Sequence, residues 1–251
     1  KFKLLILFIV IANSGFAQEM FKYFTADDFA KRRAKVFEQI GDGVAIMQGA
    51  EFPEGFVKLR QDNNFYYLTA VEIPNAKLLL DGKTKTSVLF VPDRMSGDIK
   101  AEAYINQTEK DAAQYKMTRI VSVNNFTAIL NRYASLGQPF YILSSPEETT
   151  EMSRDRCIAQ RAGRINDPWD GRISKETNFI NKMKERFPLV AIKDLTPVLD
   201  NMRWVKDEKE IAVIRECGRI GALGFDEAMR VTRPGIYEYQ VVAACDFIYE
   251  N

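Results

Sequence analysis

Residues 77–91 have the sequence KLLLDGKTKTSVLFV, in which two short apolar runs flank a polar turn. Short apolar runs that end at turn residues are typical of β-strands, so we predict strands over 77–80 and 87–91. The intervening Asp81-Gly82-Lys83-Thr84 is the kind of turn that joins two antiparallel strands. The stretch therefore predicts a β-hairpin.

Upstream of this hairpin, the sequence predicts one helix and two strands. Thr25 and Asp28 have the spacing of a capping box, and the apolar residues that follow recur at helical intervals up to Ile40. Gly41-Asp42-Gly43 ends that helix. A buried strand is expected over 44–47, and the aromatic, β-prone run over 64–69 is expected to form a second one.

Downstream, helices and strands continue to alternate. We predict helices over 111–117 and 126–136, and strands over 120–123 and 140–143. Residues 146–172 are polar and lack periodicity, so an irregular surface segment is expected there. The alternation predicts an α/β domain with a mixed sheet over residues 20–190.

From Asp194 onward the pattern becomes almost entirely helical. Asp207 and Glu210 form an acidic capping pair, and Arg233-Pro234-Gly235 separates a long helix from a second one. Gly218, Gly221 and Gly224 each cost about 1 kcal/mol relative to alanine within a helix, which suggests that this face lies against another backbone. The last residues stop inside an amphipathic pattern, so residues 194–251 are expected to be the start of a truncated second domain.

Composition excludes several classes of function for these 251 residues. The chain has 35 Lys+Arg, 34 Asp+Glu and no histidine. Near-neutral charge does not favour nucleic-acid binding, and the lack of histidine excludes a Ser-His-Asp triad or a metal site that contains His. Three widely spaced cysteines (Cys157, Cys217 and Cys245) are expected to be ordinary buried thiols rather than a disulfide scaffold.

The N-terminus has the pattern of a secretory signal. Lys1 and Lys3 precede an uncharged run over 4–12, and Gly15 and Ala17 are small residues placed for cleavage before Gln18. The run is shorter than the roughly 20 residues that span a bilayer. We therefore expect residues 1–17 to be a signal peptide, the protein to be exported to the periplasm or secreted, and no stable membrane anchor after cleavage.

Two blocks resemble a known family. Residues 60–76, RQDNNFYYLTAVEIPNA, are similar to the "RQ-x-S-D-F-x-Y-x-T-G-x-x-E-P-x-A" stretch of Xaa-Pro aminopeptidases. Residues 202–211, MRWVKDEKEI, and the RPGIYEY of 233–239 resemble the opening of that family's catalytic domain. The departures are Ala70 for the usual glycine, Asn63-Asn64 for the Ser-Asp pair, and Ile73 for the glutamate before proline.

The resemblance implies an α/β N-terminal domain of the aminopeptidase P (creatinase) type, followed by the first helices of a "pita-bread" metallopeptidase domain. It also implies two divalent metal ions, commonly Mn²⁺, that are held by two Asp, one His and two Glu and activate water for attack on an Xaa-Pro bond. All of these ligands would lie beyond Asn251, so this chain is expected to bind no metal and to hold no catalytic residue. A homo-oligomer that acts on peptides with proline in second position is implied.

Candidate site residues within the chain are few. The resemblance places Arg60, Asn63 and Asn64 near the substrate entrance or an oligomer contact. The aromatic run after them is more typical of a sheet core with polar loop residues ahead of it. The adjacent carboxylates Asp27-Asp28, Glu147-Glu148 and Asp207-Glu208 do not face each other on a helix and are expected to be caps or surface charges. Trp169 and Trp204 are expected to be packing residues.

Three functions remain open from the sequence. The first is the N-terminal part of an exported, metal-dependent Xaa-Pro aminopeptidase, inactive as this fragment alone. The second is a related hydrolase of the same plan, such as a prolidase or creatinase-like enzyme. The third is a catalytically dead relative that uses the peptidase fold to bind other proteins.

Overall fold

The structure, a computed structural model, describes residues 23–52, 59–93, 105–145 and 153–250. The chain divides into two compact units, Lys1–Met202 and Arg203–Asn251, which are described separately below. The expected signal peptide lies outside the described residues. None of the described helices combines the length and the apolar character that a membrane-spanning helix requires.

The first unit is built on one mixed six-stranded sheet with the strand order β4-β3-β2-β1-β5-β6. Strands β1, β5 and β6 are mutually parallel, as are β3 and β4, and only β2 runs antiparallel to its neighbours. This confirms the predicted fold class and the strand predictions, apart from the one over 64–69. The strands are β1 Val44–Gln48, β2 Lys77–Asp81, β3 Thr86–Val91, β4 Arg119–Ser122, β5 Phe140–Ile142 and β6 Ile192–Asp194.

The predicted hairpin forms, and the contacts in its turn explain the presence of Asp81 and Gly82. The Asp81 carboxylate accepts hydrogen bonds from the backbone N–H groups of Lys83 (2.9 Å) and Thr84 (3.3 Å) and from the Thr84 hydroxyl (2.6 Å). A Cβ at Gly82 would lie 2.0 Å from the carbonyl oxygen of Gly41, where no side chain fits. The turn is therefore fixed by one buried aspartate and one close backbone approach.

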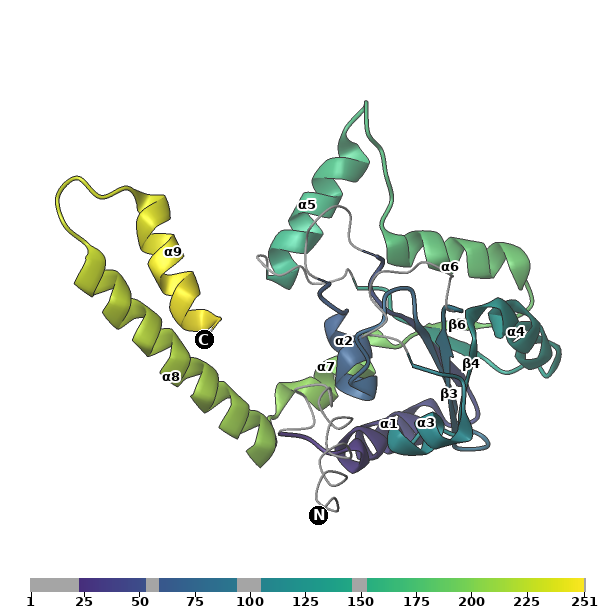
Figure 1. Cartoon of the computed structure of the whole chain (residues 1–251). Coiled ribbons are helices and arrows are strands. Elements are labelled where there is room, and N and C mark those ends of the chain that lie inside the picture. Colours follow the sequence, from purple (N-terminus) through teal and green to yellow (C-terminus); the bar gives the residue numbers. More distant parts are fainter. Residues whose placement is uncertain (1–22, 53–58, 94–104, 146–152, 251) are drawn as a thin grey trace, which may run out of the picture. The chain divides into compact units, whose positions relative to one another are not determined.

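Helices cover both faces of the sheet (Figure 1). Along β1, Ala45 and Met47 join the core cluster that also contains residues of α1, α2, α3 and α7, whereas Val44 and Ile46 join the cluster with α4 and α6. This period-two alternation is that of a strand buried on both faces. The helices are α1 Ala26–Ile40, α2 Asn63–Thr69, α3 Glu109–Gln114, α4 Phe126–Ser135, α5 Arg154–Asn166, α6 Lys175–Arg186 and α7 Thr196–Trp204.

The strand predicted over 64–69 is wrong, because these residues form α2. Asp62 caps the helix by accepting a hydrogen bond from the backbone N–H of Phe65 at 2.7 Å. Phe65 and Leu68, three residues apart, are both fully buried, a spacing that puts them on one helix face. Local capping and burial thus override the β-propensity of the aromatic run.

The expectation of an irregular segment over 146–172 is also wrong for its described part. Ser153 caps α5, a helix of 13 residues. Its only buried residue is Cys157, so it lacks the continuous apolar stripe by which helices are recognised in a sequence. Trp169, expected to pack, is instead 95% exposed in the turn after α5.

The second unit is a pair of helices, α8 Glu208–Val231 and α9 Glu238–Tyr249. The capping pair is confirmed: the Asp207 side chain accepts from Glu210 N at 2.8 Å, and Glu210 accepts from Asp207 N at 2.9 Å. The helical prediction from Asp194 onward is confirmed, since β6 ends at Asp194 and α7 begins at Thr196. Leu199 of α7 belongs to the core of the first unit.

In the described part of the chain, only one of the three helical glycines has a close neighbour, and that neighbour is a side chain rather than the expected backbone. A Cβ at Gly224 would meet the Tyr249 ring at 2.3 Å, whereas nothing among the described residues lies within 4 Å of one at Gly218 or Gly221. Trp204, also expected to pack, is 83% exposed.

The cysteines form no disulfide in the described part of the chain, as expected. Only Cys157 is buried, however, since Cys217 is exposed and Cys245 is half-buried.

Candidate functional site

The carboxyl ends of parallel strands share one edge of a sheet, where ligands bind in open α/β folds. At the ends of β1 and β5, a small pocket is formed with Gln48, Asp62, Asn64, Ser145, Lys175 and Glu176 as its polar lining. We call it the carboxyl-edge pocket. Its volume of about 30 Å³ leaves room for ordered water.

Gln61 organises the turn that leads into this pocket. Its side-chain oxygen accepts from the backbone N–H groups of Ala50 (2.5 Å) and Asp62 (3.0 Å). Its side-chain nitrogen donates to the carbonyls of Val71 (3.0 Å) and Ile73 (3.1 Å). All four hydrogen-bonding positions of the amide are therefore used, and the buried Gln61 joins three separate parts of the chain.

Asp62 is a buried carboxylate at the start of α2, next to the pocket. Burial raises the pKa of Asp62, while the hydrogen bond from the backbone of Phe65 and the positive charge of Lys175 oppose that shift. Lys175 also donates to the carbonyl of Gly49 at 2.9 Å. Glu176 accepts from Arg161 at 2.9 Å. The polar lining is therefore held by internal hydrogen bonds and ion pairs.

The C-terminal end of α2 is held by a buried arginine of α1. Arg33 is 1% exposed and donates to the carbonyls of Leu68 (2.8 Å), Tyr115 (3.1 Å) and Lys116 (2.6 Å). Burial lowers the pKa of Arg33 to about 10, which still leaves it charged at neutral pH. One guanidinium therefore connects α1, α2 and the end of α3.

The three residues that the sequence singled out lie at the start of α2 but in different environments. Arg60 is exposed, Asn63 is half-buried, and Asn64 is buried and lines the carboxyl-edge pocket. The structure thus brings Asn64 together with Asp62, whereas Arg60 and Asn63 are not in the pocket lining. Their role at an entrance or an oligomer contact stays a prediction.

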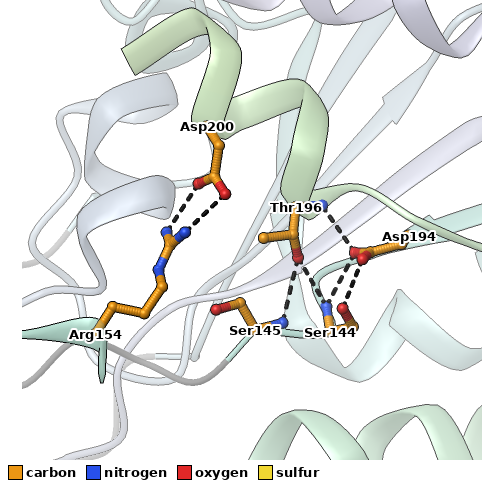
Figure 2. Close-up of polar contacts among 6 residues, drawn as sticks. All are labelled: Ser144, Ser145, Arg154, Asp194, Thr196 and Asp200. Atoms are coloured by element: carbon orange, nitrogen blue, oxygen red, sulfur yellow. Dashed lines mark hydrogen bonds and ion pairs between the residues drawn. The ribbon is translucent and has the colours of Figure 1, made fainter. Parts of the chain in front are cut away.

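A second polar network lies at the ends of β5 and β6 (Figure 2). The Ser144 hydroxyl donates to Asp194 at 2.7 Å, and Asp194 also accepts from the backbone N–H of Thr196 at 2.8 Å. The Thr196 hydroxyl oxygen accepts from the backbone N–H groups of Ser144 (3.1 Å) and Ser145 (3.2 Å). These hydrogen bonds lower the pKa of Asp194 against the opposing effect of burial.

The same figure shows how α7 is tied to α5. Arg154 forms two hydrogen bonds to the Asp200 carboxylate, at 2.7 Å and 2.8 Å (Figure 2). A bidentate Arg–carboxylate pair fixes orientation as well as distance. Within the first unit, the two networks therefore hold α7 against α5 and the end of the sheet.

The two networks do not form a cluster of metal ligands. Among the described residues, no group of three or more His, Cys, Asp or Glu side chains is placed to hold a metal ion. Asp28 and Asp207 are helix caps, as predicted, while Glu147-Glu148 lies outside the described residues. The arrangement at the carboxyl edge can position a helix and bind polar groups.

Sequence reasoning missed several residues of this site. Gln61 and Asp62 stand inside the quoted 60–76 block, and an Asp before an apolar residue pair at helical spacing is a capping signal that could have identified α2. Lys175 and Glu176 are about 110 residues further along the chain. No local sequence pattern connects them to the pocket.

Comparison with known proteins supports the family resemblance noted for residues 60–76. The family described as "Aminopeptidase P, N-terminal domain" matches residues 29–141. Xaa-Pro aminopeptidases of Haemophilus influenzae and Escherichia coli are each 26% identical to this chain, over 89% and 85% of its length. The matched regions are 47% and 46% of those relatives, so the chain spans about half their length.

Solved structures show the same fold. A putative aminopeptidase P from Bacillus anthracis is similar with a TM-score of 0.70 at 19% identity, covering 90% of this chain and 52% of that one. An Escherichia coli aminopeptidase P variant in complex with substrate has a TM-score of 0.63 at 23% identity, covering 90% and 50%.

Proposed function

Because this chain belongs to the aminopeptidase P family, whose N-terminal domain matches residues 29–141, we propose that it is the N-terminal portion of an Xaa-Pro aminopeptidase. The proposed reaction of the whole protein is release of the amino-terminal residue of peptides with proline in second position. The observation that carries the proposal is the family match, supported by two relatives of that name.

Metal dependence, with Mn²⁺ as the proposed ion, is part of this proposal for the whole protein. The described residues do not fit a metal centre, since they contain no suitable group of ligands. We therefore assign no catalytic step to this chain. Its proposed contribution is to fold, to contact other subunits and to shape the entrance through which a peptide reaches the catalytic part.

The proposed entrance residues are Arg60, Asn63 and Asn64 at the start of α2. The rigidity of this region supports the proposal, because Gln61 and Arg33 fix α2 at both ends through buried hydrogen bonds. A rigid support is what a recognition surface needs to hold side chains in a productive geometry. Arg60, exposed ahead of the helix, is the residue best placed to meet a solvent-borne peptide.

The test of activity uses the full-length protein. We expect cleavage of an Ala-Pro-Ala peptide, loss of that cleavage with a chelator, and recovery on addition of Mn²⁺. An Ala-Ala-Ala peptide should not be cleaved. Hydrolysis of creatine or of Xaa-Pro dipeptides alone would instead identify a creatinase-like enzyme or a prolidase, and an inactive, metal-free protein would identify a dead relative.

The test of the entrance is a pair of arginine variants in the same full-length protein. Arg60→Ala is expected to raise KM for a long Xaa-Pro peptide several-fold, since it removes a contact to substrate, with the melting temperature unchanged. Arg132→Ala, an exposed arginine on α4, is the matched control and should leave KM unchanged. Equal effects of the two variants would remove Arg60 from the entrance.

Export and oligomerisation are proposals that rest on the N-terminal pattern and on the family. Amino-terminal sequencing of the protein from the periplasm or culture medium should begin at Gln18. A cytoplasmic protein that retains residues 1–17 would contradict export. Sedimentation of the full-length protein as a single species smaller than a dimer would contradict the oligomer.

A further inference from the structure

A second concave surface of the first unit lies between α5 and α6 and shares Lys175 and Glu176 with the carboxyl-edge pocket. It has a volume of about 310 Å³, within the range of small-ligand sites and roughly ten times that of the carboxyl-edge pocket. We call it the α5–α6 groove. Its lining is Cys157, Gln160, Arg161, Arg164, Arg172, Ile173, Ser174, Lys175 and Glu176.

The groove is predominantly cationic. Three arginines and one lysine line it together with the carboxylate of Glu176. Two further carboxylates pair with this lining, Asp170 with Arg172 and Glu51 with Lys175 at 3.8 Å. Arg161 is paired with Glu176 at 2.9 Å, and Arg172 forms two hydrogen bonds to Asp170, at 2.5 Å and 2.9 Å. Each guanidinium carries five N–H donors in a fixed geometry, so Arg161 and Arg172 keep further donors for an additional carboxylate. Arg164 is the third guanidinium in the lining.

An exposed tryptophan lies three residues from Arg172 along the chain, in the turn that joins α5 to α6 at the top of Figure 1. The turn is ordered by its own hydrogen bonds. Trp169 N donates to the Asp167 side chain at 2.8 Å, and Gly171 N donates to the Arg164 carbonyl at 3.0 Å. An indole that is 95% exposed on such a fixed turn is pre-organised for contact.

Two partly exposed isoleucines are close to Trp169 in the sequence. Ile165 and Ile173 are 44% and 46% exposed, and Ile173 belongs to the groove lining. Tryptophan and arginine are the residues most enriched among those that carry binding energy at protein interfaces. The groove therefore combines anchors for apolar side chains with donors for carboxylates.

From this juxtaposition we propose that the α5–α6 groove and Trp169 form a docking site for an acidic peptide segment of a partner protein. Its carboxylates are held by Arg161, Arg164 and Arg172, and an apolar side chain packs on Trp169 and Ile173. Charge complementarity selects this occupant. A second copy of the chain would bring the same cationic lining against itself, which like-charge repulsion disfavours.

The binding experiment uses the fluorescence of Trp169. The full-length protein is compared with its Trp169→Phe variant, so that the difference between the two emission spectra is the fluorescence of Trp169. The probe is an N-acetylated, C-amidated peptide of sequence EELEEL, titrated at low ionic strength. We expect a saturable blue shift of the emission, because packing removes the indole from water, and a several-fold weaker affinity at 300 mM than at 50 mM NaCl.

The control probe replaces each glutamate by glutamine. The QQLQQL peptide should bind at least fivefold more weakly, because it keeps the leucines but loses the charges. Equal binding of the two peptides, or absence of a saturable shift, would overturn the proposal.

Matched variants locate the site. Arg164→Gln in the groove should weaken EELEEL binding roughly two- to fivefold, the effect expected for one solvent-exposed ion pair. Arg156→Gln changes an exposed arginine of the same helix that does not line the groove and should leave affinity unchanged. Equal weakening by both variants would show only a diffuse charge effect and would refute the docking site. Circular dichroism checks that both variants keep their helices.

Discussion

The two compact units of this chain bury their side chains to very different extents. In the first unit, two clusters of buried residues cover the two faces of the sheet. In the second, Gly224 is the only buried residue among those that the structure describes. The first unit therefore has its own hydrophobic core, whereas the α8–α9 pair has only the contact between its helices.

The exposed side chains of the second unit show what this difference means. A small unit without a core is not expected to be stable alone, and a large apolar surface usually marks a contact with other protein. The relatives are about twice as long as this chain. The large apolar residues exposed here are Ile214, Leu223, Phe225, Met229, Tyr237, Tyr239, Val242, Phe247 and Tyr249.

The largest expected effect tests this contrast directly with one phenylalanine from each unit. Phe90 is fully buried and packs edge-on against Phe126 at 5.1 Å between ring centroids. Phe90→Ala should lower the free energy of unfolding of the first unit by about 3–5 kcal/mol. Phe225→Ala, at a 71% exposed side chain, should change it by less than about 0.5 kcal/mol. Urea titration measures both, and similar losses would contradict the contrast.

A second comparison uses one arginine from each unit. Arg33→Met leaves three backbone carbonyls without their donor, and we expect a loss of roughly 2–4 kcal/mol in unfolding free energy. Arg215→Met, at an exposed position of α8, should stay within about 0.5 kcal/mol of the parent. A stable Arg33→Met variant would mean that the guanidinium is not needed to hold α1, α2 and α3 together.

The sequence predicted most of the first unit because its strands and turn are determined locally. The runs at 77–80 and 87–91 are apolar, and Asp81 and Gly82 meet the demands of the turn with their own atoms. The start of α8 was predictable for the same reason, since Asp207 and Glu210 cap each other. Where a few neighbouring residues carry the cause of an element, sequence reasoning finds it.

The errors arise where the cause is distant or the local preferences conflict. The aromatic run of α2 has β-propensity, yet its buried face is set by a core assembled from other helices and strands. The carboxyl-edge pocket joins Asp62 to Lys175, and no sequence period relates residues so far apart. Trp169 and Trp204 were expected to pack because large aromatic residues usually do, but both are exposed.

A third, smaller effect concerns the buried cap Asp62. Because burial raises the folded-state pKa of Asp62 above its unfolded value, its contribution to stability is complete below the unfolded pKa and is lost as pH rises through the folded pKa. Asp62→Asn keeps an equally good cap but cannot titrate. Its unfolding free energy relative to the parent should therefore increase between pH 3 and pH 7.

The control for this prediction separates the cap from the charge. Asp62→Ala removes both and should lose about 1 kcal/mol through the missing cap. Thermal unfolding across the pH range gives the comparison. An Asn variant whose difference from the parent falls as pH rises would show that the pairing of Asp62 with Lys175 outweighs its burial.

The smallest expected effect compares two alanines within the first unit. Ala70 and Ala76 are both fully buried, but Ala70 has a left-handed backbone, with φ 58° and ψ 19°. Relief of that strain by Ala70→Gly gains about 1–2 kcal/mol. This offsets about 0.8 kcal/mol for the lost methyl group and roughly 0.4–1 kcal/mol of chain entropy. Ala70→Gly should therefore be nearly neutral.

Ala76→Gly has the same two costs without the compensation, because Ala76 is not among the residues with positive φ. We expect it to lose about 1.5 kcal/mol of unfolding free energy in urea. The difference between the two variants isolates the strain at the position where the family pattern has glycine. Equal losses would mean that the surrounding core holds Ala70 in its left-handed conformation at no cost, and that glycine is usual there for another reason.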